Sequence, residues 1–243
     1  MNRKVIEVPC KSNENKYTHR IIRYTLGKND TIYENALKNA PILAKKLNDK
    51  DPSGKIRTTD IKETVAFSGY IAEAIVMSEL NKKLLELNPA GNIIAHSVEF
   101  NKTNRDSFDQ IDIKVTNTFT NNSKTIEVRS SNIFKVKEKD EEVYDIDQSL
   151  IGSYSTKNKL GEVKKDFYVT VFFRHSQEKL MYIKKNSYSF TTDIAGAASR
   201  ENLEKLGVES NLKQNGANYL VINPISKSDS IDKICLEIYN LLK

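Results

Sequence analysis

The chain contains no tryptophan, so other aromatic residues must fill its interior, and it has 11 tyrosines and 9 phenylalanines for this purpose. Only two cysteines are present, Cys10 and Cys235, and they form no Cys-x-x-Cys pair. These scarcities argue against a thiolate zinc site and against a disulfide framework. They are typical of proteins in a reducing compartment.

Long apolar runs are also missing. No stretch approaches the ~18 apolar residues that a membrane span requires. Residues 1–10 lack the apolar segment of a signal peptide. We therefore expect a soluble protein that is located in the cytoplasm.

Several common active-site motifs are absent. The sequence contains no Gly-x-x-x-x-Gly-Lys-Ser/Thr, no Gly-x-Gly-x-x-Gly and no Gly-x-Ser-x-Gly, so nucleotide hydrolysis, dinucleotide binding and the commonest serine hydrolases lack support. His19, His96 and His175 share no metal-ligand spacing, which disfavours a histidine-metal nuclease.

The charge that is present is mainly basic. The chain of 243 residues carries 38 Lys and Arg against 32 Asp and Glu, a net charge of +6. Such a balance favours polyanionic partners such as DNA or RNA. The same bias would also arise without any function if the gene came from an AT-rich genome.

The pattern of apolar residues predicts an α/β fold in which helices flank a central mixed β-sheet, within a single domain of residues 1–243. We expect an N-terminal helical part at about 1–58, a core at about 59–185 and a C-terminal part at about 186–243. Thr31 and Glu34 have capping-box spacing at the start of a helix that Pro41 should kink or split. The other expected elements are helices at 60–87 and after a cap at Ser228 or Asp229, and strands at 93–100, 108–119, 124–134, 166–174, 180–184 and 219–222.

The chemistry-bearing pattern begins in the hairpin formed by the second and third of these strands. Because side chains alternate along a strand, Asp112 and Lys114 should share one face, and Glu127 and Arg129 one face of the next strand. Two carboxylates on one side of a hairpin repel each other unless a cation lies between them, and Mg²⁺ prefers such hard oxygen ligands. An ordinary amphipathic hairpin with a solvated charged face is the alternative.

A third carboxylate, Glu73, lies on the apolar stripe of the preceding helix. A carboxylate on a core-facing stripe is costly unless it is paired or lies near a metal ion. It could simply reach an Arg or Lys at the edge of the stripe. Gly69, one turn earlier, should let this helix approach the sheet closely.

Together these elements resemble the PD-(D/E)XK nuclease superfamily, and in particular its type II restriction endonucleases. The resemblance covers about residues 60–134. It rests on the helix segment Gly69-Tyr70-Ile71-Ala72-Glu73, on Asp112, and on Glu127-Val128-Arg129, which follows Asp112 by 15 residues. It implies a homodimer that cleaves double-stranded DNA with Mg²⁺ held by Asp112, Glu127 and Glu73.

The sequence departs from the superfamily where Arg129 stands in place of the usual lysine. Arginine does not lose its proton in proteins, so Arg129 can stabilise charge on a phosphate but cannot act as a general base. Lys114 could substitute for the lysine. A non-catalytic DNA- or RNA-binding protein on the same fold, or a structural subunit, are the alternatives.

Additional nucleic-acid contacts are expected from residues that follow the hairpin. Hydroxyl, aromatic and basic side chains suit contacts with phosphates and grooves. The candidates are Ser130, Ser131, Asn132, Tyr154, Lys157, Lys159, Lys164 and Lys165.

Overall fold

The computed structural model describes residues 1–12, 15–50, 55–98, 112–133, 140, 143–144, 148–154, 164–211 and 218–243. The helices are α1 (Thr31–Ala44), α2 (Thr59–Leu87), α4 (Gln177–Asn186), α5 (Arg200–Leu206) and α6 (Ile231–Leu242), with a 3₁₀ turn at Ile225–Lys227. The strands are β1 (Asn2–Ser12), β2 (Asn15–Leu26), β3 (Ile93–Ser97), β4 (Ile113–Asn117), β5 (Ser123–Asn132), β6 (Leu150–Tyr154), β7 (Phe167–Phe173), β8 (Phe190–Ser199), β9 (Val208–Ser210) and β10 (Tyr219–Ile222).

The centre of the molecule is a seven-stranded sheet with the order β1-β2-β8-β7-β5-β4-β3. The pair β5–β7 is parallel and the other neighbouring pairs are antiparallel, so the sheet is mixed. Strand β7 lies in the middle and is buried at every residue, which is why its sequence, FYVTVFF, is almost continuously apolar. The expected α/β fold with helices around a mixed sheet is confirmed.

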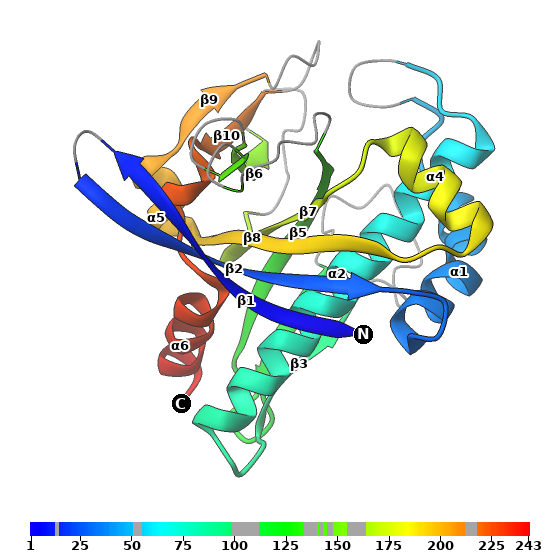
Figure 1. Cartoon of the computed structure of the whole chain (residues 1–243). Coiled ribbons are helices and arrows are strands. Elements are labelled where there is room, and N and C mark those ends of the chain that lie inside the picture. The colour runs from blue at the N-terminus through cyan, green and yellow to red at the C-terminus, as the bar shows by residue number, and fades with distance from the viewer. Residues whose placement is uncertain are drawn as a thin grey trace.

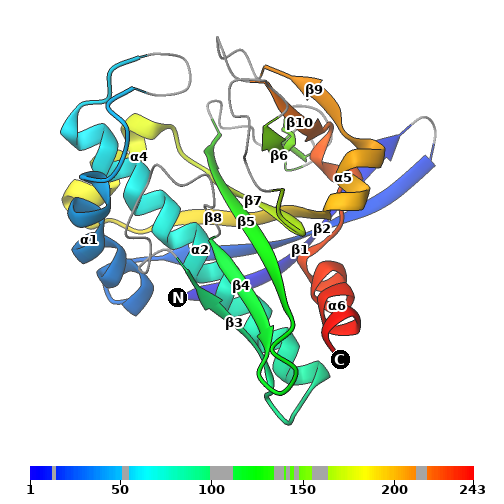
Figure 2. The ribbon, with the colours of Figure 1, turned by 180° about the vertical axis from the view of Figure 1, so that it is seen from behind.

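The two faces of this sheet are covered differently (Figures 1 and 2). Helix α2 runs across one face, and α1, α4 and α6 contribute to the same apolar core. The opposite face is covered by α5 and by a second, three-stranded sheet with the order β6-β10-β9. This second sheet matters for the site, because it lies over the face that carries Glu127.

Gly196 in β8 explains how the chain after β10 can approach the central sheet. A Cβ atom at this position would lie 2.3 Å from Ser228 Oγ and 2.9 Å from Ile225 Cγ1. The pairing of β8 with β7 also shifts its register beside Gly196. Gly196 is thus a point of tight packing inside a strand.

Several sequence-based predictions of local structure are wrong. The first 26 residues form the β1–β2 hairpin, in which the two strands pair along their whole length, rather than part of a helical region. Residues 180–184 belong to helix α4, because Ser176 accepts a hydrogen bond from Lys179 N and caps it. The N-cap of α1 is Asp30 rather than Thr31, and α6 is capped by Ser230.

Other predictions are confirmed. Helix α2 is one continuous helix, and Thr58 caps it by accepting a hydrogen bond from Ile61 N. Strands β4 and β5 pair as an antiparallel hairpin, with Asn121 at φ 60° in the connecting turn. By contrast, the expected split of α1 at Pro41 is wrong, because the helix continues past Pro41 to Ala44. In the described part of the chain, no helix is long and apolar enough to span a membrane.

Candidate metal and nucleic-acid site

The hairpin brings Asp112 and Glu127 to neighbouring positions. The antiparallel register pairs Ile113 with Ile126, so extending it by one residue places Asp112 opposite Glu127. Side chains directly opposite each other in an antiparallel pair lie on the same face. The predicted shared face of these two carboxylates is therefore consistent with the observed register.

The same place marks the end of the β4–β5 ladder. Strand β5 continues to Asn132 alongside β7, whereas its pairing with β4 stops at Ile113 and Ile126. Beyond this point the Asp112 carboxylate replaces a backbone acceptor, because its Oδ2 accepts a hydrogen bond from Val128 N at 2.8 Å. Strands that separate in this way leave polar backbone groups available for a ligand.

Asp112 is also fixed from the other side. Its backbone carbonyl accepts a hydrogen bond of 3.0 Å from Val98 N, immediately after β3. The carboxylate is thus held at the junction of β3, β4 and β5. A residue anchored at both its backbone and its side chain is well suited to hold a ligand in a fixed position.

Glu127 and Arg129 form an ion pair on this face. Arg129 Nη2 lies 2.5 Å from Glu127 Oε1, and the two side chains are 23% and 11% exposed. The guanidinium carbon of Arg129 also lies 5.9 Å from the ring centroid of Tyr219 in β10. Arg129 therefore contacts both the central and the second sheet.

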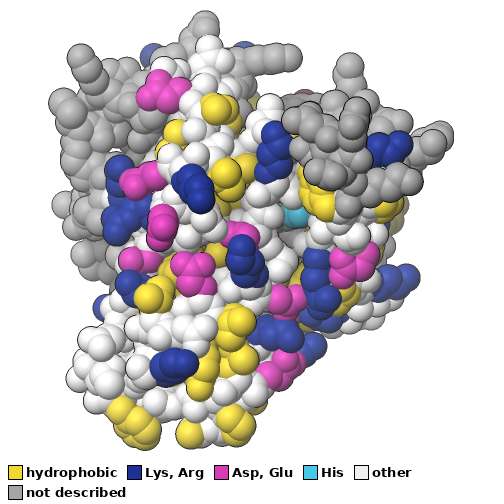
Figure 3. Space-filling view, turned by 90° about the vertical axis from the view of Figure 1, so that its left-hand side faces the viewer, with side chains coloured by type: hydrophobic (Ala, Val, Ile, Leu, Met, Phe, Trp, Pro, Cys, Tyr) yellow, Lys and Arg dark blue, Asp and Glu magenta, His cyan; other side chains and the backbone are white. Residues whose placement is uncertain are grey.

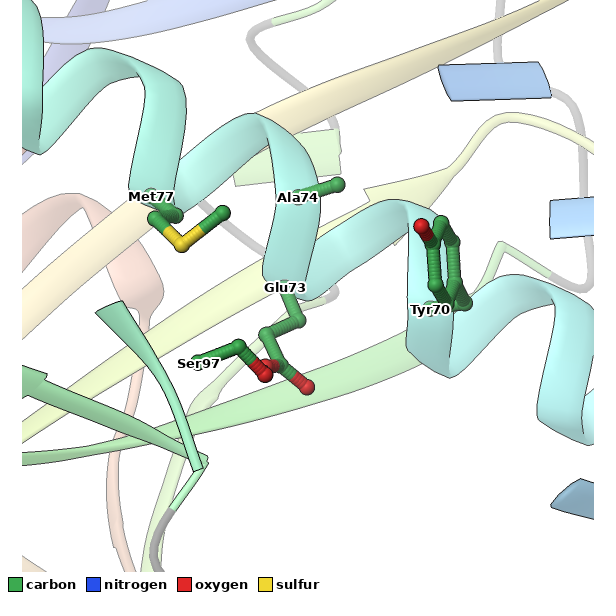
Figure 4. A pocket seen from close by; sticks show the side chains of 5 residues that line it. All are labelled: Tyr70, Glu73, Ala74, Met77 and Ser97. Atoms are coloured by element: carbon green, nitrogen blue, oxygen red, sulfur yellow. The ribbon is translucent and has the colours of Figure 1, made fainter. Parts of the chain in front are cut away.

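Glu73 lies at the same end of the sheet but on the face covered by α2. Its side chain points toward Ser97, the last residue of β3, and Ser97 Oγ donates a hydrogen bond to Glu73 Oε1 (Figure 4). Ser97 pairs with Ile113, the residue next to Asp112. Glu73 is buried as expected, at 7% exposure, and Ser97 is one of its hydrogen-bond partners.

A small cavity of about 60 Å³ adjoins Glu73 and is lined by Tyr70, Ala74, Met77 and Ser97 (Figure 4). This volume is enough for one or two water molecules. Gly69 does not have the role expected of it, because a Cβ atom there would meet no atom within 4 Å. The close approach of α2 to the sheet therefore does not depend on this glycine.

The donor set fits a magnesium ion better than zinc. Among the described residues, no group of three or more His, Cys, Asp or Glu side chains gathers as a metal cluster, so Glu73, Asp112 and Glu127 are not one three-carboxylate site. Mg²⁺ is commonly held by one or two carboxylates, with waters and substrate phosphates completing its octahedron. Asp112 and Glu127 meet this requirement, and the Val128 carbonyl can add an oxygen because it points to the same side as the Val128 N–H.

The structure places the other candidate contacts as follows. Lys114 is half-buried, on the same face as Asp112. Ser130, Ser131 and Asn132 are half-buried residues of β5, and Asn132 Nδ2 donates to the carbonyl of His175 at 3.0 Å. The side chain of Tyr154, and all of Lys157 and Lys159, lie outside the described residues.

Lys164 and Lys165 differ from each other. Lys164 is exposed and forms an ion pair with Glu204 at 2.7 Å. Lys165 is only 1% exposed, and its Nζ forms no hydrogen bond with any described residue. The Lys165 side chain is therefore enclosed rather than exposed, and the Tyr168 hydroxyl beside it accepts a hydrogen bond from Lys165 N.

Sequence reasoning did not identify Ser97 or Tyr219 as parts of the site. Ser97 could have been suspected from its place at the end of a strand that precedes Asp112. Tyr219 lies 90 residues after Arg129, and no local pattern connects the two. Their contact depends on how the second sheet packs on the central one.

A protein of the archaeon Methanocaldococcus jannaschii, described as uncharacterized protein MJECS01, is 30% identical to the chain, over 92% of this chain and 85% of the archaeal one. The chain belongs to the MJECS01 family. No family profile matches the chain, and no solved structure matches it. The relationship covers nearly the whole fold, so it extends beyond the hairpin to the second sheet.

Proposed function

We propose that the protein is a Mg²⁺-dependent endonuclease that hydrolyses phosphodiester bonds of double-stranded DNA at specific sites. In this proposal its fold and site correspond to those of type II restriction endonucleases of the PD-(D/E)XK superfamily. The observation that carries the proposal is the β4–β5 register, which, when extended by one residue, places Asp112 opposite Glu127 where the two strands separate, with Asp112 held there by a hydrogen bond from Val128 N. The proposal includes a homodimer in the cytoplasm, since a two-fold protein matches a two-fold DNA site.

Each residue has a role that follows from its position. Asp112 and Glu127 would hold the metal ion, with the Val128 carbonyl as a further oxygen ligand. A bound Mg²⁺ supplies Lewis acidity toward a phosphate and makes a water molecule more acidic. Arg129 would stabilise negative charge that develops on the phosphate, because a guanidinium binds phosphate oxygens through paired hydrogen bonds.

Arg129 stays protonated, so it cannot accept the proton that the attacking water loses. Glu73 can accept a hydrogen bond from a water molecule at the same end of the sheet, and Ser97 fixes the orientation of its carboxylate. Lys114 shares the face of Asp112 and is a second candidate for contact with the phosphate. In this arrangement Arg129, Glu73 and Lys114 would share the roles that the lysine of the superfamily motif usually has.

The net charge of +6 supports a nucleic-acid partner but does not locate it. In the described part of the face that includes the tip of the β1–β2 hairpin and α5, Lys and Arg side chains are interspersed with Asp and Glu (Figure 3). The proposal therefore rests on the site between β4 and β5 rather than on a basic surface.

A second candidate function is non-catalytic binding of DNA or RNA on the same fold. The ion pair between Arg129 and Glu127 favours it, because a carboxylate neutralised by arginine is a weaker metal ligand. Binding of this kind would weaken steeply with salt, as phosphate contacts do. It would not require a divalent cation.

The test is incubation of the purified protein with phage or plasmid DNA, with and without Mg²⁺, followed by gel electrophoresis. Discrete fragments that appear only with Mg²⁺ are expected, and Asp112→Asn and Glu127→Gln should each reduce cleavage at least about 100-fold. Glu34→Gln, an exposed carboxylate of α1, is the matched control and should cut normally. Retarded but uncut DNA would favour the binding protein, and full activity in both site variants would reject the site.

A further inference from the structure

Arg129 is held between two groups of different chemistry. One is the Glu127 carboxylate of the central sheet, at 2.5 Å. The other is the ring face of Tyr219, at 5.9 Å from the guanidinium carbon. Tyr219 belongs to β10 and is only 5% exposed, so its ring is fixed by the packing of the second sheet.

These two partners respond differently to a divalent cation. A carboxylate is a preferred ligand of Mg²⁺ and Mn²⁺. An aromatic face is a poor ligand for such hard cations but attracts a guanidinium, which is weakly hydrated and planar. The Arg129 guanidinium would therefore give up the Glu127 carboxylate to a divalent cation but keep its contact with the ring of Tyr219.

We propose that Arg129 competes with the divalent cation for Glu127, and that Tyr219 is the positioning residue that retains the displaced guanidinium beside the site. This inference rests on the proposed function, because it takes a cation site at Asp112 and Glu127 as its starting point. The displaced guanidinium then faces the group that enters with the cation, which is a phosphate of the nucleic acid.

The competition affects the protein both without and with a bound cation. Without a cation, Arg129 neutralises Glu127 and so limits its repulsion with Asp112. With a cation bound, the positive charge of Arg129 remains nearby and lowers the affinity for the cation. Arg129 thus favours binding of the cation together with an anionic substrate over binding of the cation alone.

The experiment measures Mn²⁺ binding to the full-length protein by calorimetry in the absence of DNA. Arg129→Met removes the competitor and is expected to bind Mn²⁺ about 10-fold more tightly than the natural protein. Tyr219→Leu removes the ring and should bind Mn²⁺ about 2- to 10-fold more weakly, because the guanidinium then leaves Glu127 less readily. Tyr219→Phe keeps the ring and should behave like the natural protein.

The double variant separates this role from a structural one. If Tyr219 acts only through Arg129, the Arg129→Met, Tyr219→Leu protein should bind Mn²⁺ as tightly as Arg129→Met alone. Additive effects would overturn the role of Tyr219. An unchanged affinity in Arg129→Met would overturn the competition, whether or not the leucine variant folds.

Failure of the inference can be told apart from failure of the proposed function. Mn²⁺ binding that Glu127→Gln abolishes and Arg129→Met leaves unchanged would keep the cation site and reject the competition. No Mn²⁺ binding in either the natural protein or Arg129→Met would reject both.

Discussion

Two acidic clusters lie on the same face of the central sheet, and they differ in how completely their charges are satisfied. In the first, Asp193 of β8 is fully buried and accepts hydrogen bonds from Arg23 Nε at 2.8 Å, Arg174 Nη1 at 3.3 Å and the Tyr144 hydroxyl. Asp140 joins the same two arginines at 2.9 and 2.6 Å. In the second, Glu127 retains some exposure and pairs with Arg129.

This difference in the number of donors indicates that Asp193 is a structural carboxylate, whereas Glu127 is suited to exchange its partner. Asp193 is surrounded by donors from Arg23 of β2, from Arg174 directly after β7 and from Tyr144, so any ligand would have to displace all of them at once. Glu127 lies where two strands separate, and its arginine has the ring of Tyr219 as a second contact. Burial and charge alone therefore do not identify a site, and the geometry of the neighbouring strands decides.

The largest effect on stability is expected from the cluster around Asp193, which is called the satisfied cluster because its carboxylates have several hydrogen-bond donors. Asp193→Asn removes a fully buried negative charge between two half-buried arginines, and it should lower the free energy of unfolding by about 3–5 kcal/mol. For a chain of this size, the melting temperature should fall by roughly 6–20 °C. Thermal unfolding followed by circular dichroism measures this.

The matched control for this variant is Asp49→Asn, which breaks an ion pair with Lys62 at a side chain that is 86% exposed. It should leave the melting temperature almost unchanged, because an exposed ion pair is screened by solvent. Glu127→Gln should resemble this control in stability while it loses cleavage. If instead Glu127→Gln destabilised the protein as strongly as Asp193→Asn, the contrast between the two clusters would be lost.

The parts of the fold that the sequence predicted are those whose own residues dictate them. Strand β7 is buried on both faces and is therefore apolar throughout, and α2 and α6 carry apolar residues at helical spacing. The β4–β5 hairpin could be predicted with its face assignment, because alternation and the turn residues agree. Asp112 and Glu127 emerged from the same alternation.

The elements that escaped prediction are formed by contacts from elsewhere in the chain. Strand β8 contains Asp193 and several small residues, so its sequence lacks the pattern of a strand, and partners on β2 and β7 specify it instead. Residues 180–184 were apolar enough for a strand, but the Ser176 cap and the burial of Leu180 and Ile183 make a helix. Tyr219 joined the site only through tertiary packing.

A third charged group on this face sharpens the comparison, because Lys165 is buried with no hydrogen bond from Nζ to a described residue. Desolvating a charged group without a partner is unfavourable, so Lys165→Met should raise the free energy of unfolding by about 1–3 kcal/mol. The neighbouring Lys164→Met alters an exposed ion pair and should change it by less than about 0.5 kcal/mol. Chemical denaturation of both variants measures the difference.

The same two variants should be assayed for DNA cleavage. A Lys165→Met protein that is more stable but cuts less would mean that this lysine is retained for function at a cost in stability. A decrease in stability would contradict the expectation and would mean that the ammonium group has a stabilising partner in the folded protein.

The smallest effect is expected from Asp140 and depends on pH. Burial by itself raises the pKa of Asp140, but hydrogen bonds from Arg23 and the charge of Arg174 outweigh it and hold the pKa below the ordinary 3.8. A carboxyl whose pKa is lower in the folded protein contributes stability above its unfolded pKa, and this contribution is lost as the pH falls through the folded value. The stability contributed by Asp140 should thus be complete at neutral pH and should decline below about pH 4.

Asp140→Asn tests this dependence directly. At neutral pH it should cost about 1 kcal/mol, because the side chain is partly exposed and its two ion pairs are partly screened. At about pH 3 the variant and the natural protein should differ less, since the natural carboxyl is then becoming protonated as well. Urea denaturation at the two pH values measures both differences. A difference that stayed the same at both would mean that the charge of Asp140 contributes nothing, and that the satisfied cluster depends on Asp193 alone.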